Sequence, residues 1–324
     1  MKAIHVDSDQ LIWRETPGPT VGSGEVKISN RASAINRADL MQAAGAYPPP
    51  PGASPILGLE CAGVVSEVGD GVTRYKPGDE VCALLTGGGY AEDVVVPTEQ
   101  VLPIPRGLSF TQAAALPEVL ATAYLNLYIE AALQPGETVL LHAGASGVGT
   151  AGIQLCKAFG NPCFVTAGSD DKIEQCIALG ASAGANRHNV SFVDKLDEWT
   201  NGRGFDVILD PVGAAYLDDN IKSLAPDGRL VLIGLMGGAK AELTISSMLM
   251  KRLRVIGSTL RARPVAAKGR LMDALHQRVW PLIEAGTFAP IVDTVIPVEE
   301  ASRAHELIAS DTTVGKVILD ITPA

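Results

Sequence analysis

The chain has 324 residues and a formal net charge of −10, from 26 Lys and Arg against 36 Asp and Glu. An acidic chain with no basic run is poorly suited to nucleic acid or an anionic membrane surface, because phosphate binding needs clustered Lys and Arg. No apolar run approaches the length that spans a bilayer, and the start lacks the pattern of a signal peptide. We therefore expect a cytoplasmic protein that neither enters a membrane nor binds nucleic acid.

The length exceeds one ordinary domain, so we expect two. The first third of the chain is rich in β-forming runs that are separated by Gly, Pro and Asp turns. These runs are residues 25–29, 62–68, 80–84 and 91–96. They predict a mostly β, barrel-like domain.

A glycine-rich turn follows the apolar run of residues 138–141. Residues 142–149 read His-Ala-Gly-Ala-Ser-Gly-Val-Gly, and a helix-compatible segment follows. The spacing matches the dinucleotide motif G-x-G-x-x-G with Ser at its second glycine. Backbone N–H groups at the start of the helix would hold a diphosphate. The predicted contacts are Gly144, Ala145, Ser146, Gly147, Val148 and Gly149.

Strand-like and helix-like segments alternate from this turn to about residue 258. The predicted strands are residues 138–141, 162–167, 205–210, 229–234 and 254–258, each apolar enough to be covered on both faces. This alternation predicts a doubly wound parallel sheet, in which ligands bind at the carboxyl ends of the strands. Residues 144–149, 168–169, 210–213 and 234–238 would meet at that edge.

The cysteines and histidines show no metal-binding or disulfide pattern. Five Cys share no C-x-x-C spacing, and five His include no pair at ligand spacing. We expect the thiols to be buried small hydrophobes. His142 is expected to be a strand residue rather than a catalytic base.

Several segments together are highly specific: residues 34–39, 45–51, 58–63, 113–117 and 142–149. In them the chain resembles the medium-chain dehydrogenase/reductases, and among these the zinc-free quinone oxidoreductases of the zeta-crystallin type. Residues 37–41, 49–53, 87–89 and 234–238 look most like the branch that includes the tumour-suppressor-inducible quinone oxidoreductase. The resemblance implies an α/β protein with a GroES-like β-barrel domain at 1–115, completed by 259–324, and a Rossmann domain at 116–258.

The resemblance also shows what this chain lacks. Zinc-dependent relatives carry Cys where this chain has Asn36 and His where it has Leu59, and they add a four-cysteine lobe. An amide and a Leu cannot replace thiolate and imidazole around Zn²⁺. The resemblance therefore implies no metal, and acceptors that are already electrophilic.

Cofactor preference depends on the end of the second Rossmann strand, where NAD enzymes place an acid. Relatives that bind NADP carry a Gly-Ser pair followed by Lys, which this chain matches at Gly168, Ser169 and Lys172. Asp170 and Asp171 depart from that pattern unless they point to solvent in the first turn of a helix. Arg187 stands where relatives often place Tyr against the phosphate, and it would pair with a 2′-phosphate. We favour NADPH.

The resemblance also places residues near the nicotinamide and the acceptor. Tyr47, Asn36 and Asp39 are the predicted catalytic residues, with Glu60 beside them. The predicted cofactor contacts are Thr122, Gly234, Leu235, Met236, Gly237, Ser258, Thr259 and Leu260. Structural alternatives are a turn cap for Asn36, a helix start for Asp39 and a buried cation as partner of Glu60.

The resulting hypothesis is NADPH-dependent, zinc-independent reduction of quinones by one or two electrons in a cleft between the two domains. An alkenal or enone double-bond reductase is the alternative, and a non-enzymatic crystallin-like or RNA-binding role is a distant one. The partner is thus a small quinone or conjugated carbonyl. The resemblance further implies a homodimer, or a tetramer, that pairs through the Rossmann sheet edge at residues 254–258 and 240–246.

Overall fold

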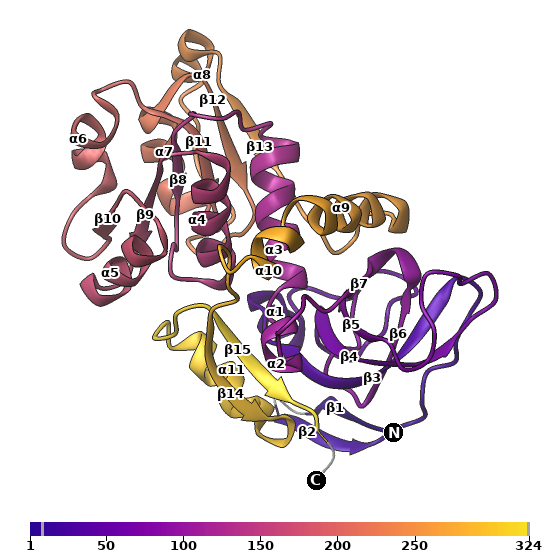
Figure 1. Ribbon diagram of the computed structural model, residues 1–324. Coiled ribbons are helices and arrows are strands. Elements are labelled where there is room, and N and C mark those ends of the chain that lie inside the picture. The colour runs from indigo at the N-terminus through magenta and orange to yellow at the C-terminus, as the bar shows by residue number, and fades with distance from the viewer. Residues whose placement is uncertain (8–9, 323–324) are drawn as a thin grey trace. The chain divides into compact units, whose positions relative to one another are not determined.

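The computed structural model describes residues 1–7 and 10–322 (Figure 1). The chain forms two compact units. Unit 1 combines Met1–Ala121 with Leu260–Ala324, and unit 2 is Thr122–Thr259. The boundaries expected from sequence lay after residues 115 and 258.

Unit 1 is built on a seven-stranded, mainly antiparallel sheet in the order β14-β15-β3-β4-β5-β7, with β6 paired to β3. Five of its strands point alternate Val and Ile side chains into one shared core, as the walls of a barrel do. They are β3 (Glu25–Ala34), β4 (Glu60–Val68), β5 (Glu80–Leu84), β6 (Asp93–Pro97) and β7 (Val101–Pro103). The predicted β-rich first domain is confirmed.

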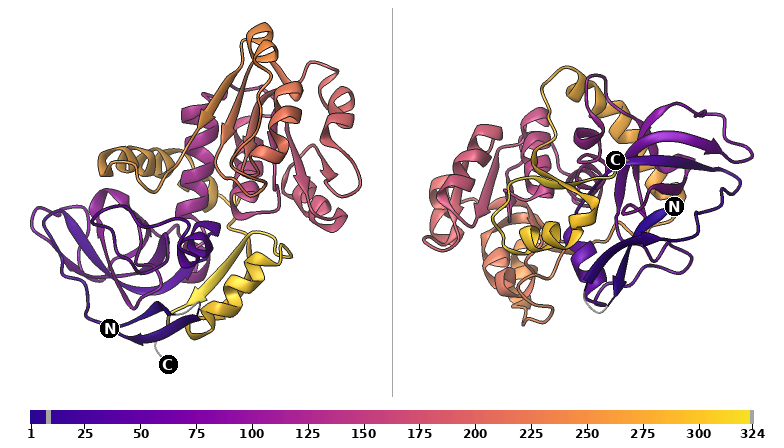
Figure 2. Two further views of the ribbon diagram at one scale, coloured as in Figure 1. Left: turned by 180° about the vertical axis from the view of Figure 1, so that it is seen from behind. Right: turned by 90° about the horizontal axis from the view of Figure 1, so that it is seen from below.

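The last segment of the chain completes unit 1. Strand β15 (Lys316–Asp320) pairs antiparallel with β3 and parallel with β14 (Val292–Pro297). Helix α11 (Ala301–Ala309) packs against the N-terminal hairpin of β1 (Lys2–Asp7) and β2 (Gln10–Glu15), as the views in Figures 1 and 2 agree. The two ends of the sequence are therefore neighbours within this unit.

The other helices of unit 1 are short, except α9. They are α1 (Arg37–Ala43), η1 (Thr98–Gln100), α2 (Phe110–Ala113), α3 (Pro117–Tyr124), α9 (Val265–Arg278), α10 (Trp280–Glu284) and η5 (Val298–Glu300). Helix α3 runs across the boundary into unit 2 and continues there as the π-helical turn η2 (Leu125–Glu130). Among the helices of the described residues, none is long and apolar enough to cross a membrane.

Unit 2 is a parallel six-stranded sheet in the order β10-β9-β8-β11-β12-β13. Its strands are β8 (Val139–Leu141), β9 (Cys163–Ala167), β10 (Ala183–Asn186), β11 (Phe205–Asp210), β12 (Leu224–Leu232) and β13 (Arg254–Gly257). The first strand lies in the middle, and the strand order reverses between β8 and β11. The predicted doubly wound sheet is confirmed, with its switch point beside the glycine turn.

Helices cover both faces of this sheet, because right-handed crossovers run outward from β8 in one direction and from β11 in the other. On one face α4 packs on α5, and on the other α7 packs on α8. The helices are α4 (Gly147–Phe159), α5 (Asp170–Leu179), η3 (Phe192–Lys195), α6 (Leu196–Thr200), η4 (Ala214–Tyr216), α7 (Leu217–Ser223) and α8 (Ile245–Lys251). All five cysteines are free and buried, as predicted.

Strand β13 differs from the sequence prediction. It was expected to be covered on both faces, but Arg254 and Gly257 are exposed. The reason is its place at the edge of the sheet.

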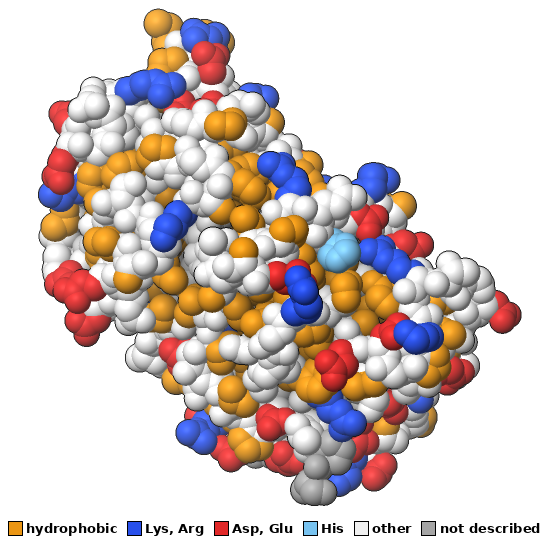
Figure 3. Space-filling view, viewed as in Figure 1, with side chains coloured by type: hydrophobic (Ala, Val, Ile, Leu, Met, Phe, Trp, Pro, Cys, Tyr) orange, Lys and Arg blue, Asp and Glu red, His pale blue; other side chains and the backbone are white. Residues whose placement is uncertain are grey.

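Helix α8 exposes three apolar side chains. Ile245, Leu249 and Met250 are 73%, 75% and 77% exposed. Figure 3 shows apolar side chains among charged ones at the top of the view, where α8 lies in Figure 1.

Candidate cofactor and active site

The glycine turn of unit 2 leaves no room for side chains at two of its glycines. A Cβ on Gly144 would lie 2.6 Å from Cβ of Val165 in β9, and one on Gly149 would lie 2.5 Å from the Ala143 carbonyl oxygen. Ser146 begins α4, and its hydroxyl accepts from the Gly149 N–H at 3.1 Å. Ser146 is exposed, and Gly147 and Val148 are partly exposed. The turn therefore offers helix-terminal N–H groups at the switch point, which fits a dinucleotide diphosphate.

The residues predicted to determine the preference for NADPH over NADH lie at the end of β9. Ser169 is the N-cap of α5 and accepts from the Lys172 N–H at 3.3 Å. Asp170 and Asp171 are exposed in the first turn of that helix, which is the condition under which they need not oppose a 2′-phosphate. Asn186 donates to Asp170 at 2.9 Å. Arg187 follows β10, and its N–H bonds the Ala167 carbonyl at 3.0 Å, so it lies beside the end of β9.

The loops after β11 and β12 bond to one another. Gly237 donates its N–H to the Val212 carbonyl at 2.6 Å, and Met236 donates to Pro211 at 3.2 Å. Leu235 and Met236 are about half exposed, at 55% and 51%. The structure thus brings Gly234, Leu235, Met236 and Gly237 together in one loop at the carboxyl edge of the sheet. Ser258 and Thr259 follow β13 at the same edge, and the Ser258 N–H bonds Leu232 at 3.0 Å.

His142, directly after β8, belongs to a buried chain of side chains. Asp210 accepts from the N–H groups of Val212 and Gly213 and from the Asn220 amide, at 2.9 Å for the last. The Asn220 oxygen therefore faces Nε2 of His142 at 2.7 Å, and Nδ1 lies 3.0 Å from the Thr166 hydroxyl. The Asn220 oxygen can only accept, so Nε2 carries a proton, and in the neutral ring Nδ1 accepts from the Thr166 hydroxyl. Burial lowers the pKa of His142 to about 4, opposed by the Asn220 bond.

In unit 1, Asn36 and Asp39 begin helix α1. Asn36 is the N-cap, and its N–H donates to the Asp39 carboxylate at 2.8 Å. Asp39 is fully buried and also accepts from the Gly58 N–H at 3.0 Å and the Tyr90 hydroxyl at 3.1 Å. Burial raises the pKa of Asp39 to about 6, and the two N–H donors oppose this. Asn36 thus caps α1, and Asp39 lies in its first turn, positions that are compatible with the structural alternatives.

Lys316 and Glu60 form a buried ion pair around Asn36. The Lys316 ammonium donates to the Glu60 carboxylate at 2.9 Å, to the Asn36 amide oxygen at 2.7 Å and to the Ile35 carbonyl at 2.6 Å. The Asn36 amide in turn donates to Glu60 at 3.0 Å. The other Glu60 oxygen accepts from the Glu118 N–H at the start of α3, at 2.8 Å. The expected buried cation is thus Lys316, which sequence reasoning did not identify.

These residues do not fit a zinc ion. At the two positions where zinc-dependent relatives carry Cys and His, this chain has an Asn bonded to Lys316 and Glu60, and the buried apolar Leu59. Within residues 1–7 and 10–322, no group of three or more His, Cys, Asp or Glu is placed to hold a metal ion.

Tyr47 lies on the proline-rich loop after α1 and is partly buried. Its ring lies under the Arg261 guanidinium, with 5.4 Å between Cζ and the ring centroid. Burial raises the pKa of Tyr47, the Arg261 charge lowers it, and Glu118 raises it further. Arg261, which bonds the Tyr47 and Thr86 carbonyls, and Lys268, which bonds the Thr86 hydroxyl, were missed from sequence, because only the fold brings them to these partners.

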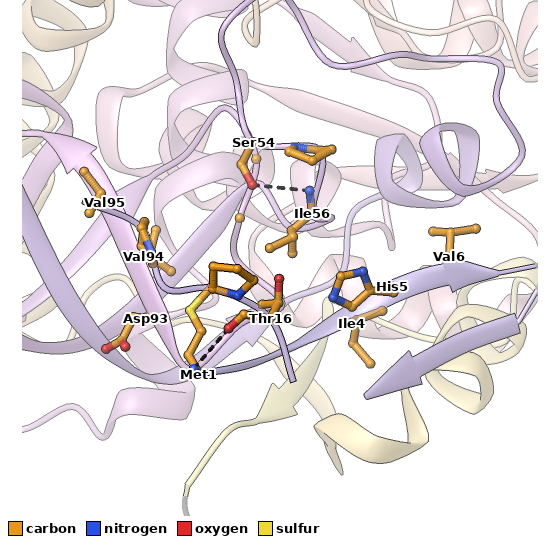
Figure 4. A pocket seen from close by; sticks show the side chains of 15 residues that line it. Met1, Ile4, His5, Val6, Thr16, Ser54, Ile56, Asp93, Val94 and Val95 are labelled. Atoms are coloured by element: carbon orange, nitrogen blue, oxygen red, sulfur yellow. Dashed lines mark hydrogen bonds between the residues drawn. The ribbon is translucent and has the colours of Figure 1, made fainter. Parts of the chain in front are cut away.

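Two hollows lie within the units. One of about 500 Å³ in unit 1 lies between the first hairpin, residues 54–56 and strand β6, with His5, Ser54 and Asp93 among its lining residues (Figure 4). It contains none of the predicted site residues. The other, of about 280 Å³ in unit 2, is lined by Arg187, Thr166, Phe192, Tyr216 and Asp219, among others. Only the second includes a predicted site residue.

Two family profiles match the chain. One is described as an alcohol dehydrogenase GroES-like domain and covers residues 22–106, and the other is described as a zinc-binding dehydrogenase and covers residues 147–276. The human synaptic vesicle membrane protein VAT-1 homolog is 32% identical over 97% of this chain and 83% of its own length. Rat quinone oxidoreductase is 31% identical over 93% of this chain and 90% of its own length.

Other similarities extend the comparison. Phthioceranic/hydroxyphthioceranic acid synthase of Mycobacterium tuberculosis is 34% identical over 95% of this chain, which matches 14% of that protein. Among solved structures, Escherichia coli quinone oxidoreductase complexed with NADPH superposes with a TM-score of 0.87 at 28% identity, covering 98% of each chain. An NAD-dependent alcohol dehydrogenase also gives 0.87, at 31% identity over 99% of this chain and 100% of its own.

We expect Lys316→Met to lower the free energy of unfolding by about 3–5 kcal/mol, because it leaves the Glu60 carboxylate buried without its cation. Urea titration measures this. The double variant Lys316→Met/Glu60→Gln should recover much of the loss, since a neutral amide replaces the carboxylate. Lys27→Met is the control, because the Lys27–Asp93 pair at 3.6 Å is partly exposed and should contribute less than about 1 kcal/mol. Equal losses in the single and double variants would contradict this account.

The His142 network predicts a pH-dependent stability. The folded pKa of about 4 is below the ordinary value of 6.5, so between these values the unfolded chain binds a proton that the folded chain does not. The contribution of His142 to the free energy of unfolding is then complete above pH 6.5, and up to about 3 kcal/mol of it is lost as the pH drops to 4. Urea titrations across this range should show a shallower fall for His142→Gln than for the parent. Replacement of the exposed His188 by Gln should leave the profile unchanged, and parallel profiles for His142→Gln and parent would refute the prediction.

Proposed function

Because this chain belongs to the medium-chain dehydrogenase/reductase family, we propose that it catalyses the NADPH-dependent reduction of quinones without zinc. The observation that carries the proposal is the Asn36 cluster, in which an amide held by Lys316 and Glu60 stands at a zinc-ligand position. Without a Lewis acid to polarise the acceptor, electrophilic acceptors such as quinones are favoured over simple ketones. The similarity to quinone oxidoreductases from rat and Escherichia coli supports this choice.

The chain's own residues would bind and orient the reactants. When bound, the reduced nicotinamide supplies the reducing equivalents. The N–H groups at the start of α4 would bind the diphosphate, and the Tyr47 phenol would donate a proton to the reduced acceptor oxygen. Asn36 and Asp39 would act by fixing α1 beneath the Tyr47 loop, since their hydrogen bonds are directed to protein groups. The proposal covers transfer of one or two electrons.

The preference for NADPH rests on the end of β9. Ser169 and Arg187 supply a hydroxyl and a cation there, whereas Lys172 is buried in the first turn of α5, and the exposed Asp170 is bonded to Asn186. The hollow of about 280 Å³ beside Arg187 is large enough for part of a nucleotide, although Asp219 also lines it. Charge-assisted bonds to a 2′-phosphate would outweigh the neighbouring acid.

A second candidate function is reduction of the double bond of an alkenal or enone. It needs the same cofactor and no metal, but the product carbon must also receive a proton. The phenol of Tyr47 would supply that proton; burial raises the pKa of Tyr47, and the Arg261 charge opposes this rise. A crystallin-like or RNA-binding role finds less support, because the net charge of −10 opposes binding to RNA.

We also propose that the protein pairs with a second copy through β13. This strand is an exposed sheet edge, and the exposed apolar side chains of α8 lie beside it. Pairing of two β13 strands would satisfy the free backbone groups and cover those side chains.

We expect NADPH oxidation with 9,10-phenanthrenequinone that persists after chelator treatment, and little turnover of an unactivated ketone. An α,β-unsaturated aldehyde, assayed in parallel, separates the two candidate functions. Turnover of the aldehyde alone would assign the chain to double-bond reduction, and loss of quinone turnover with chelator would contradict a zinc-free mechanism.

We expect Arg187→Ala to weaken NADPH binding about tenfold or more, because one charge-assisted bond to the 2′-phosphate is lost. NADH binding should change little, as it lacks that phosphate. Nicotinamide fluorescence titration measures both affinities. Lys195→Ala, which removes an exposed cation that pairs with Glu198, is the matched control. An equal loss for both cofactors in Arg187→Ala would argue against the assigned contact.

A further inference from the structure

Arg261 is a buried cation with no acidic partner among the described residues. Its side chain donates to the Thr86 carbonyl at 2.8 Å, to the Gln42 side-chain oxygen at 2.6 Å and to the Tyr47 carbonyl at 3.4 Å. All three acceptors are neutral, and only 5% of the residue is exposed. A buried guanidinium without a carboxylate carries a desolvation cost that these bonds offset only in part. A site of this kind favours a neighbouring group that becomes negative.

The group in contact with Arg261 is Tyr47. The guanidinium lies over the Tyr47 ring, 5.4 Å from its centroid, in a cation–π contact. A positive charge at this distance stabilises a phenolate more than a phenol. The charged groups that face Tyr47 are Arg261, which lowers its pKa, and Glu118, which raises it.

Arg261 also fixes the loop that carries Tyr47. Gln42, whose oxygen accepts from Arg261, donates its amide to the Pro55 carbonyl at 2.9 Å. At the other end, the N–H groups of Ala46 and Tyr47 bond the Met41 carbonyl at 2.8 and 3.2 Å. The loop between α1 and residue 55 is thereby held at its start, at Tyr47 and at its end.

A second buried cation lies behind Arg261. Lys268 is 2% exposed, and its ammonium donates to the Thr86 hydroxyl at 2.8 Å. Burial lowers the pKa of Lys268 to about 8, and the charge of Arg261 adds to this effect. Thr86 thus accepts from both cations, so Lys268 supports the loop against which Arg261 is anchored. The Asp39 carboxylate acts on Arg261 only through space.

We propose that Arg261 is a positioning residue that holds Tyr47 toward the acceptor and stabilises the phenolate formed when Tyr47 donates its proton. The inference rests on the proposed function. In the step, the quinone would gain a hydride, and with it two electrons, from the reduced nicotinamide, the quinone oxygen that becomes negative would take the Tyr47 proton, and the phenolate would remain beside Arg261. Water then returns a proton to Tyr47. The step is balanced, with the acceptor reduced by two electrons and the nicotinamide oxidised.

Variants of Arg261 can separate two effects: its hydrogen bonds, which hold the Tyr47 loop, and its charge, which stabilises the phenolate. Arg261→Gln removes the charge, whereas Arg261→Lys keeps it but loses the planar fork that bonds three acceptors. Gln42→Met removes one of the hydrogen bonds that Arg261 donates, and it removes no charge. Arg270→Gln, an exposed position on the same helix as Lys268, is the control for a change of net charge.

The test is an ultraviolet titration of tyrosinate in the full chain without cofactor or acceptor, with the Tyr47→Phe profile subtracted to isolate Tyr47. We expect the Tyr47 midpoint to move to higher pH in Arg261→Gln. It should stay near the parent in Arg270→Gln and Gln42→Met, and move less in Arg261→Lys than in Arg261→Gln. An unchanged midpoint in Arg261→Gln would overturn the proposal. If Arg261→Gln does not fold, Arg261→Met is the second neutral variant, and an unchanged Tyr47 midpoint in it would likewise overturn the proposal.

Kinetics with 9,10-phenanthrenequinone complete the test. We expect Arg261→Gln to lower kcat about tenfold or more, with a smaller change in KM, and to move the alkaline limb of its pH profile with the tyrosinate midpoint. A shifted midpoint with an unmoved limb would refute the role in proton donation. If the parent itself reduces no quinone and no alkenal, the proposed function fails and the catalytic part of this inference fails with it. The titration then reports separately whether Arg261 acts on Tyr47.

Discussion

The buried ion pair between Lys316 and Glu60 is the interaction on which unit 1 depends most. Its atoms come from β15, from β4, from the end of β3 and from the start of α3, which are far apart in sequence. Each of the three ammonium donors meets an oxygen, and each Glu60 oxygen meets a donor, so the charges are satisfied despite their burial. One cluster therefore fixes the returning C-terminal segment, the first turn of α1 and the helix that leads into unit 2.

Unit 2 depends on a comparable relay of hydrogen bonds that contains the Asp210 carboxylate but no ion pair. Two backbone N–H groups fix the Asp210 carboxylate, which orients the Asn220 amide, and this amide sets the tautomer of His142. His142 in turn meets Thr166 of β9, so the relay connects the ends of the three strands that flank the switch point. Because each group in the chain has one satisfactory orientation, the edge that carries the glycine turn is held without a charged pair.

The sequence predicted most of the elements that depend on local patterns. Glycine spacing located the turn and α4, and apolar runs located the strands of unit 2 except β10, whose sequence Ala-Gly-Ala-Asn is not an apolar run. Residues in one loop, such as Gly234 to Gly237, were grouped correctly because neighbours in sequence stay neighbours in space. The exposure of β13 was not predicted, since an edge strand and a central strand share the same apolar composition and differ only in their position in the sheet.

Lys316, Arg261 and Lys268 could not have been found in this way. A lysine or an arginine is normally a solvated residue, and only the tertiary contacts show that these three are buried. Their partners lie 280, 219 and 182 residues away in the sequence. Two of these cations face neutral oxygens rather than carboxylates. A fold that keeps positive charge out of water beside a phenol has a polar environment organised before any ligand arrives, and such preorganised charge lowers the energy of an anion without rearrangement. In the proposed reaction, the Arg261 guanidinium, which three hydrogen bonds fix, would act in this way on the Tyr47 phenolate.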